Sequence, residues 1–213
     1  LLSGIVKYMR KFLPGIIVVF FLLGVGAVFA GVSYWKEKQE TAWINSLAGR
    51  HPEGVQYMQE LFKAREELRD RDKKNDFSAY LRMGVNLNLL KEKEKALEWY
   101  EKVLQQDATN FLALNNMANI YDELGRYDKS EEAWLKLIAA YPDKTSFYRS
   151  LGYLYRYRMQ KTSKAIENLF RKGLAVTNNS PDLLNWLTSY FLETGNNEKF
   201  VEYANLLNAS SKQ

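Results

Sequence analysis

The sequence predicts an all-α protein in which one apolar helix precedes an array of helix pairs. Three observations support this fold class. An uncharged run of 24 residues extends from Phe12 to Trp35, apolar residues beyond it recur at helical spacing, and similar side chains repeat every 34 residues from Tyr80 onward. The 213 residues include no cysteine and one histidine, His51, which excludes thiol chemistry, disulfides and metal sites that need two imidazoles.

The charges are unevenly distributed along the chain. The chain contains 30 Lys and Arg residues and 25 Asp and Glu residues, for a net charge of +5, but every acidic residue follows Trp35. Before that point the only charged residues are Lys7, Arg10 and Lys11. The rest of the chain is therefore mixed in charge and close to neutral, which argues against a nucleic-acid-binding surface.

Residues 12–35 are expected to form a transmembrane helix. At about 1.5 Å per residue, such a helix is longer than the roughly 30 Å hydrocarbon core of a bilayer. Tyr34 and Trp35 would then lie at the membrane interface. A cleavable signal peptide with a cleavage site after Ala30 is the alternative, but the apolar run exceeds the roughly 7–15 residues of a signal core.

The basic flank over residues 1–11 sets the expected topology. It predicts a single-pass membrane protein with a cytoplasmic N-terminus and an extracytoplasmic, periplasm-like array. Small residues within the span could allow a second membrane helix to approach closely, although a lipid-facing surface is an equal alternative. The four residues of this predicted membrane helix packing are Gly26, Ala27, Ala30 and Gly31.

Residues 36–76 are expected to form a helical connector or capping hairpin. The first helix should end at Gly49–Pro52, where glycine and proline interrupt the helical pattern. Beyond it, apolar residues such as Val55 and Leu61 recur at helical spacing opposite a charged face. The mixed-sign charges of that face are typical of a solvated surface.

The remaining residues contain an internal repeat. The array is expected over 77–213, with copies near 77–110, 111–144, 145–180 and 181–213. A small side chain recurs at Gly84, Ala118 and Gly152, and the fourth copy lies two residues late because of a short insertion between Tyr155 and Pro181. Each copy is predicted to form two amphipathic helices, neither of which can bury its apolar face alone.

These positions resemble the tetratricopeptide repeat (TPR) family. The matching residues are the bulky Tyr80, Leu114, Tyr148 and Leu184, the small Gly84, Ala118, Gly152 and Thr188, the second-helix Ala96, Ser130 and Ala165, the turn residues Gly125 and Gly195, and Pro142. Lys91, Ala108 and Phe200 depart from the family pattern. The resemblance covers about residues 77–209 and implies a TPR-type right-handed α-solenoid whose first helices line a concave ligand-binding face.

The predicted concave face provides the candidate partner-binding residues. They are Asn115, Asn119, Asp122, Arg149, Tyr153, Arg156 and Tyr157. The last four share one helical face, where arginine can hold a carboxylate through two hydrogen bonds and tyrosine adds rigid contact area. An ordinary solvated face is the alternative. The chaperone-tail clamp of some family members is not expected, because only Asn116 fits its pattern.

The sequence contains no catalytic, cofactor-binding or metal-binding motif, so we expect no enzyme and no cofactor. We expect a membrane-anchored protein–protein interaction scaffold or assembly subunit. Its partners would be other proteins, presented as an extended peptide or a membrane-complex subunit, with no nucleic acid and no small-molecule substrate. The alternatives are a permanent structural subunit of a larger membrane complex, a translocon-associated chaperone-like TPR protein, and an enzyme-associated regulator, which would need a phosphate-binding loop.

Overall fold

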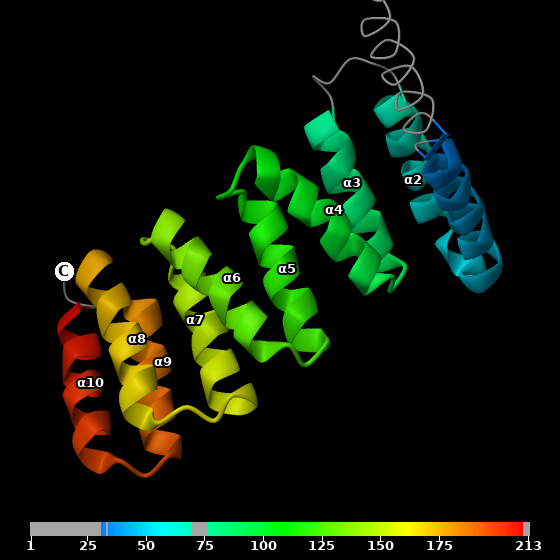
Figure 1. Ribbon diagram of the computed structural model, residues 1–213. Coiled ribbons are helices and arrows are strands. Elements are labelled where there is room, and N and C mark those ends of the chain that lie inside the picture. Colours follow the sequence, from blue (N-terminus) through cyan, green and yellow to red (C-terminus); the bar gives the residue numbers. More distant parts are fainter. Residues whose placement is uncertain (1–30, 33, 70–75, 211–213) are drawn as a thin grey trace, which may run out of the picture. The chain divides into compact units, whose positions relative to one another are not determined.

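Helices provide all the regular secondary structure in the residues that the computed structural model describes, which are 31–32, 34–69 and 76–210 (Figure 1). The all-α fold class predicted from the sequence is therefore confirmed. The chain divides into two units, Leu1–Met58 and Gln59–Gln213, and each is described by itself.

In the first unit, residues 34–50 are helical and are followed by the short helix η1 (Pro52–Gly54). Pro52 begins η1, a position where the missing amide hydrogen costs nothing. The next helix, α2 (Val55–Arg69), begins in the first unit and ends in the second. The glycine and proline near residue 50 thus separate two helices.

The predicted single-pass membrane localisation is contradicted, because no helix in the described residues is long and apolar enough to cross a membrane. The predicted transmembrane helix itself is not shown. Residues 12–30 and 33 of the predicted span lie outside the described residues. The helix over 34–50 soon becomes polar, because four of the five residues after Trp35 are charged. The expected single-pass topology, with a cytoplasmic N-terminus and an extracytoplasmic array, is corrected accordingly.

The small residues predicted to pack a second membrane helix receive no structural support. Gly26, Ala27 and Ala30 lie outside the described residues, and Gly31 is helical. A Cβ built on Gly31 would meet no atom within 4 Å.

The described residues of the second unit include four successive helix pairs (Figure 1). The pairs are α3 (Asp76–Leu89) with α4 (Lys93–Gln106), α5 (Phe111–Glu123) with α6 (Tyr127–Ala140), α7 (Thr145–Tyr153) and η2 (Leu154–Arg158) with α8 (Ser163–Val176), and α9 (Pro181–Glu193) with α10 (Asn197–Ser210). Each pair packs on the next through its second helix, and the first helices α3 and α5, and α7 and α9, also touch. This stacking gives neighbouring pairs a shared apolar core.

Small residues allow the two helices of a pair to approach closely. A Cβ on Gly84 would lie 2.7 Å from the ring of Tyr100, and a Cβ on Gly152 would lie 2.5 Å from the ring of Phe170. The aromatic ring of the second helix therefore occupies the space that a side chain on the first helix would need. The recurrence of small and aromatic residues in the sequence reflects these contacts.

In three of the four pairs, the turn between the two helices has a residue in the left-handed backbone conformation at the same position. Lys91, Gly125 and Gly195 have φ values of 63°, 71° and 73°. In each turn the amide of the following residue donates to a carbonyl five residues earlier, as in a Schellman motif. Lys91 thus takes the conformation that glycine provides at the equivalent positions.

The third pair differs by a segment of π-helix, η2, which continues α7. The amide of Met159 donates to the carbonyl of Leu154 at 2.9 Å, and α8 begins 36 residues after α6 instead of 34. The two inserted residues therefore lie in η2 and the loop that follows. As a consequence Ile166, and not Ala165, occupies the fourth helical position that Ala96 and Ser130 hold in the earlier pairs.

Candidate partner-binding groove

Two adjoining cavities lie along the first helices of three successive pairs. The first, of about 440 Å³, is lined by Asn119, Asp122, Trp134, Ser146, Arg149, Ser150, Tyr153, Leu154 and Trp186. The second, of about 370 Å³, is lined by Arg149, Tyr153, Arg156, Tyr157, Asp182, Asn185, Trp186, Ser189, Tyr190 and Glu193. Because three residues line both cavities, we treat the two as one surface, the α5–α7–α9 groove.

The structure brings together six of the seven partner-binding residues predicted from the sequence. Asn119 and Asp122 extend from α5, whereas Arg149, Tyr153, Arg156 and Tyr157 come from α7 and η2. Asn115 lines neither cavity. Its backbone oxygen instead accepts a hydrogen bond of 2.8 Å from the side-chain amide of Asn119.

The arginines of the groove are paired with carboxylates of neighbouring helices. Arg149 Nη1 lies 3.0 Å from Asp182 Oδ1, and Arg156 Nη2 lies 2.6 Å from Glu193 Oε2, so both pairs join the third helix pair to α9. The sequence pattern instead predicted that these guanidinium groups would be available for a ligand carboxylate. In the folded chain any such carboxylate competes with one already in place.

The π-helix η2 contributes a third ion pair, which joins it to α5. Arg158 Nε lies 3.1 Å from Asp122 Oδ1 of α5. Arg156 and Arg158, two residues apart in η2, therefore reach α9 and α5 respectively. Arg158 could not be predicted from the sequence, because ordinary helical spacing does not place it on the face of Arg149 and Tyr153.

Aromatic side chains form much of the groove surface. The rings of Tyr153 and Tyr157 lie 4.7 Å apart, and about half of each side chain is exposed. Trp186 stacks with two further rings, at centroid distances of 4.1 Å to Phe170 and 5.4 Å to Tyr190. These contacts hold Trp186 in place, so the groove has a rigid aromatic surface.

Uncharged polar groups lie between the aromatic rings. The hydroxyl groups of Ser146, Ser150 and Ser189 and the amide of Asn185 make no side-chain hydrogen bond within the described part of the chain. Such groups are suited to the amides of a peptide backbone, which need both donors and acceptors.

None of the α9 residues of the groove was among the predicted partner-binding residues, although the repeat contains the signal for them. The fourth copy lies 36 residues after the third, so Arg149, Tyr153 and Tyr157 correspond to Asn185, Ser189 and Glu193. All three of these α9 residues line the second cavity. The register shift noted in the sequence was therefore sufficient to extend the predicted face by one helix.

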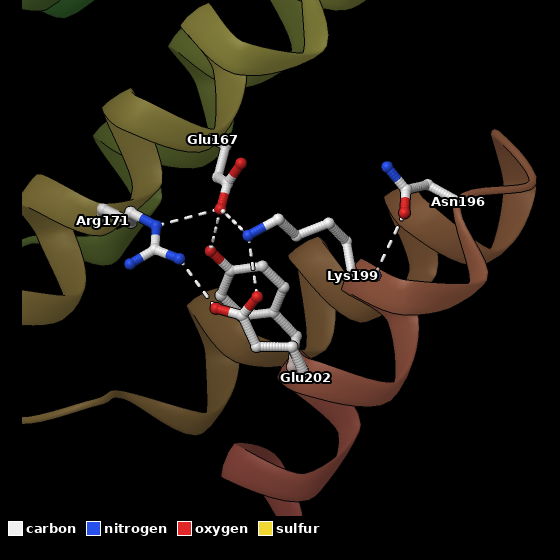
Figure 2. A network of polar contacts seen from close by, with 6 residues as sticks. Glu167, Arg171, Asn196, Lys199 and Glu202 are labelled. Carbon is white, nitrogen blue, oxygen red and sulfur yellow. Dashed lines mark hydrogen bonds and ion pairs between the residues drawn. The ribbon is translucent and has the colours of Figure 1, made fainter.

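A separate polar cluster joins α8 to α10 (Figure 2). None of its residues lines the groove. One oxygen of Glu167 accepts from the hydroxyl of Tyr203 at 2.7 Å, from Arg171 Nε at 2.9 Å and from Lys199 Nζ at 3.0 Å. Both cations also contact Glu202 at 2.7 Å. This cluster connects the second helices of the last two pairs.

The hydrogen bonds of this cluster determine how Glu167 ionises. Burial opposes ionisation, but the hydrogen bonds from Tyr203, Lys199 and Arg171 outweigh it and lower the pKa of the carboxyl group below its usual value. For Tyr203, burial and the bond to Glu167 both raise the pKa of the hydroxyl group. The cluster therefore holds a charged carboxylate beside a neutral tyrosine.

The part of the chain that the structure describes contains no group of three or more His, Asp or Glu side chains that could hold a metal ion. His51, the single histidine, lies in the first unit beside η1 and within 3.7 Å of Glu53. The residues that line the groove offer hydrogen-bonding, ion-pairing and aromatic groups.

Comparison with known proteins identifies the repeat. Two family models, both described as tetratricopeptide repeat, match residues 77–110 and 99–132. Tetratricopeptide repeats are therefore present in the chain, in the region where the sequence resemblance begins. A photosystem I assembly protein, Ycf3, from Prochlorococcus marinus is 29% identical over 110 residues, which cover 44% of this chain. The match spans 60% of the length of that relative.

Solved structures share the fold at low identity. A tetratricopeptide repeat protein from Parabacteroides merdae superposes with a TM-score of 0.58 at 19% identity, covering 80% of this chain and 67% of that one. Residues 41 to the end of MamA from Desulfovibrio magneticus give a TM-score of 0.53 at 17% identity, covering 81% and 96%. The tetratricopeptide-type solenoid of helix pairs predicted from the sequence is thus confirmed.

Proposed function

We propose that this chain is a protein-interaction scaffold that binds an extended segment of a partner protein in the α5–α7–α9 groove. The observation that carries the proposal is the groove itself, in which two adjoining cavities share Arg149, Tyr153 and Trp186. Cavities connected in this way suit an elongated ligand better than a compact one. The exposed tyrosines and unpaired hydroxyls provide the rigid and adaptable contacts that protein interfaces use.

The comparisons support an interaction role in general terms. Solenoid repeats use extended surfaces formed by successive units to bind their ligands. The curated relative is named as an assembly protein, which favours docking during the assembly of a larger complex as the setting of this interaction. Within that setting the chain would act by binding and positioning, without catalysis.

Peptide selection tests this proposal. The full chain, immobilised, is used to select binders from a phage-displayed library of random peptides of about 12 residues, and selected peptides are synthesised for affinity measurement. Binding should weaken by about tenfold or more in the Tyr153→Ser/Tyr157→Ser variant, because the exposed rings that bury ligand surface are lost.

A matched control separates binding in the groove from nonspecific binding to exposed aromatic side chains. Tyr34 and Trp35 are each 64% exposed in the first unit, so Tyr34→Ser/Trp35→Ser removes two exposed aromatic rings at another place. We expect the control variant to bind the selected peptides as the original chain does. Equal binding by all three proteins, or the selection of no peptide, would contradict the proposed function.

A further inference from the structure

We propose that the α5–α7–α9 groove selects uncharged peptide segments anchored by an aromatic side chain, and that it discriminates against acidic and basic segments. This inference rests on the proposed function and specifies its ligand. It departs from the expectation, based on the sequence, that the arginines of α7 and η2 grip a ligand carboxylate.

The first argument is charge compensation. Two arginines and three carboxylates line the groove, and Arg158, which lines neither cavity, pairs with the third carboxylate. Each of these three arginines lies within 3.1 Å of its own carboxylate. An acidic side chain that approached Arg149 would meet the carboxylate of Asp182 as a like charge, which offsets the attraction of the guanidinium group. A basic side chain meets the same difficulty at Asp182. The exchange of one ion pair for another brings little net gain on a partly exposed surface.

The second argument is the distribution of aromatic surface. Tyr153 and Trp186 line both cavities, and Tyr157 lies beside Tyr153 in the second. Arg156 lies over the rings of Tyr157 and Tyr190, at 4.7 Å and 5.2 Å from their centroids, and so helps to fix the ring of Tyr157. A ligand ring placed against Tyr153 gains contact with pre-ordered surface, without disturbing an ion pair.

The third argument concerns the ligand backbone. Ser146 and Ser150 of α7 and Asn185 and Ser189 of α9 present uncharged donors and acceptors along the two cavities. They can satisfy peptide amides at successive positions, so the ligand needs no charge for its polar contacts. Neutral hydrogen bonds combined with aromatic burial predict binding that depends little on salt.

The library selection described above also tests this inference. Among selected peptides, we expect enrichment of Phe, Tyr and Trp, with Asp, Glu, Lys and Arg no more frequent than in the unselected library. The dissociation constant of an uncharged aromatic peptide should change by less than about twofold between about 0.05 and about 0.5 M NaCl, because no net charge is neutralised on binding.

Two single substitutions provide a sharper test, because the proposed specificity predicts that each of them increases the affinity for a charged peptide. Asp182→Asn releases Arg149 and should improve the binding of a derivative of the selected peptide carrying one Glu by about tenfold, the value of an added charge-assisted hydrogen bond. Arg149→Gln releases Asp182 and should improve the binding of the derivative carrying one Lys by a similar factor. Both gains should diminish as the salt concentration rises.

The outcomes distinguish the two proposals. If the original chain selects acidic peptides that bind in a salt-dependent manner and lose affinity in Tyr153→Ser/Tyr157→Ser, the proposed function stands and the uncharged specificity is overturned. If no peptide depends on the groove, the proposed function itself fails. Aromatic, uncharged and salt-insensitive ligands, together with both gains of binding, support the inference.

Discussion

Single small residues determine how closely two helices of a pair approach. At Gly152 an added Cβ would lie within 2.7 Å of two ring atoms of Phe170, and that ring is itself stacked on Trp186 at 4.1 Å. Phe170 therefore has little freedom to move aside. Since Trp186 lines both cavities of the groove, the packing at Gly152 also supports the ligand-binding surface.

Gly152→Ala should accordingly destabilise the chain by about 1–3 kcal/mol, the usual cost of overpacking a core. Urea unfolding followed by circular dichroism measures this difference. Gly49→Ala is the matched control, because a Cβ at that helical position would meet no atom within 4 Å. Equal changes in the free energy of unfolding of the two variants would show that close helix packing at Gly152 does not require glycine.

Lys91 provides the opposite case, in which glycine should be the better residue. Its φ of 63° lies in the left-handed region, where Gly125 and Gly195 stand in the corresponding turns. We expect Lys91→Gly to stabilise the chain by about 0.5–1 kcal/mol, because relief of backbone strain exceeds the added entropy of the unfolded chain. Gly125→Lys should destabilise it, and the same unfolding measurement compares both. A loss of stability in Lys91→Gly would contradict this explanation.

At the scale of elements, the π-helix η2 sets the geometry of the groove. It allows Arg156 to reach Glu193 of α9 while Arg158 reaches Asp122 of α5. Deleting Gln160 and Lys161 restores the 34-residue spacing of the other pairs and should remove η2. We expect helical content to be retained and the affinity for groove-selected peptides to fall by about tenfold or more.

The control for this deletion keeps the length of the loop. Gln160 has a φ of 50°, so Gln160→Gly fits the existing turn and should leave peptide affinity unchanged. Circular dichroism and peptide titration of the two variants provide the comparison. If the deletion variant binds as well as the original chain, η2 is not required for the groove.

The contact between α8 and α10 should depend on pH through Glu167. Because the pKa of Glu167 in the folded chain lies below the ordinary value of 4.5, the folded state holds its proton less tightly than the unfolded state. The stabilisation is thus complete above the unfolded pKa and is lost as the pH falls through the folded one. The difference in Tm between the original chain and Glu167→Gln should narrow as the pH falls from about 6 to about 3.

An exposed carboxylate provides the reference for this titration. Glu101→Gln, on the surface of α4, should change Tm little at any pH in that range. A constant Tm difference between the original chain and Glu167→Gln would mean that the carboxylate does not titrate with a lowered pKa.

The repeat explains which elements could be predicted from the sequence and which could not. The 34-residue recurrence of Gly84, Ala118 and Gly152 predicted paired helices, and the shared face of Arg149, Tyr153 and Arg156 follows from helical periodicity alone. The arginine–carboxylate pairs join residues more than 30 positions apart, so they depend on how neighbouring helices align. The insertion was visible as a shift of register, but its conversion into a π-helix was not.

The apolar run at the N-terminus illustrates a different limit. Hydropathy predicted a spanning helix over residues 12–35, whereas the described part of that region enters a helix whose next residues are charged. A window of apolar residues reports composition, and it does not include how the helix continues beyond its own end.

The second unit is a stack of helix pairs that share one packing geometry but differ from pair to pair in their surface residues. Along the first helices, the surface residues change from Val85 and Leu89 in α3 to Asn119 in α5 and to the tyrosines of α7 and η2. The packing positions behind them keep their small and aromatic character. The function we propose therefore depends on the surface residues of α5, α7, η2 and α9, which the common fold presents.

Hydrogen–deuterium exchange of the full chain, with and without a groove-selected peptide, tests the central claim most directly. We expect slower amide exchange on binding in residues 145–158 and 181–193, because the ligand covers the first helices and restricts their local opening. Exchange in α4, α6 and α8 should change less. Protection confined to those second helices, or no protection at all, would contradict binding in the α5–α7–α9 groove.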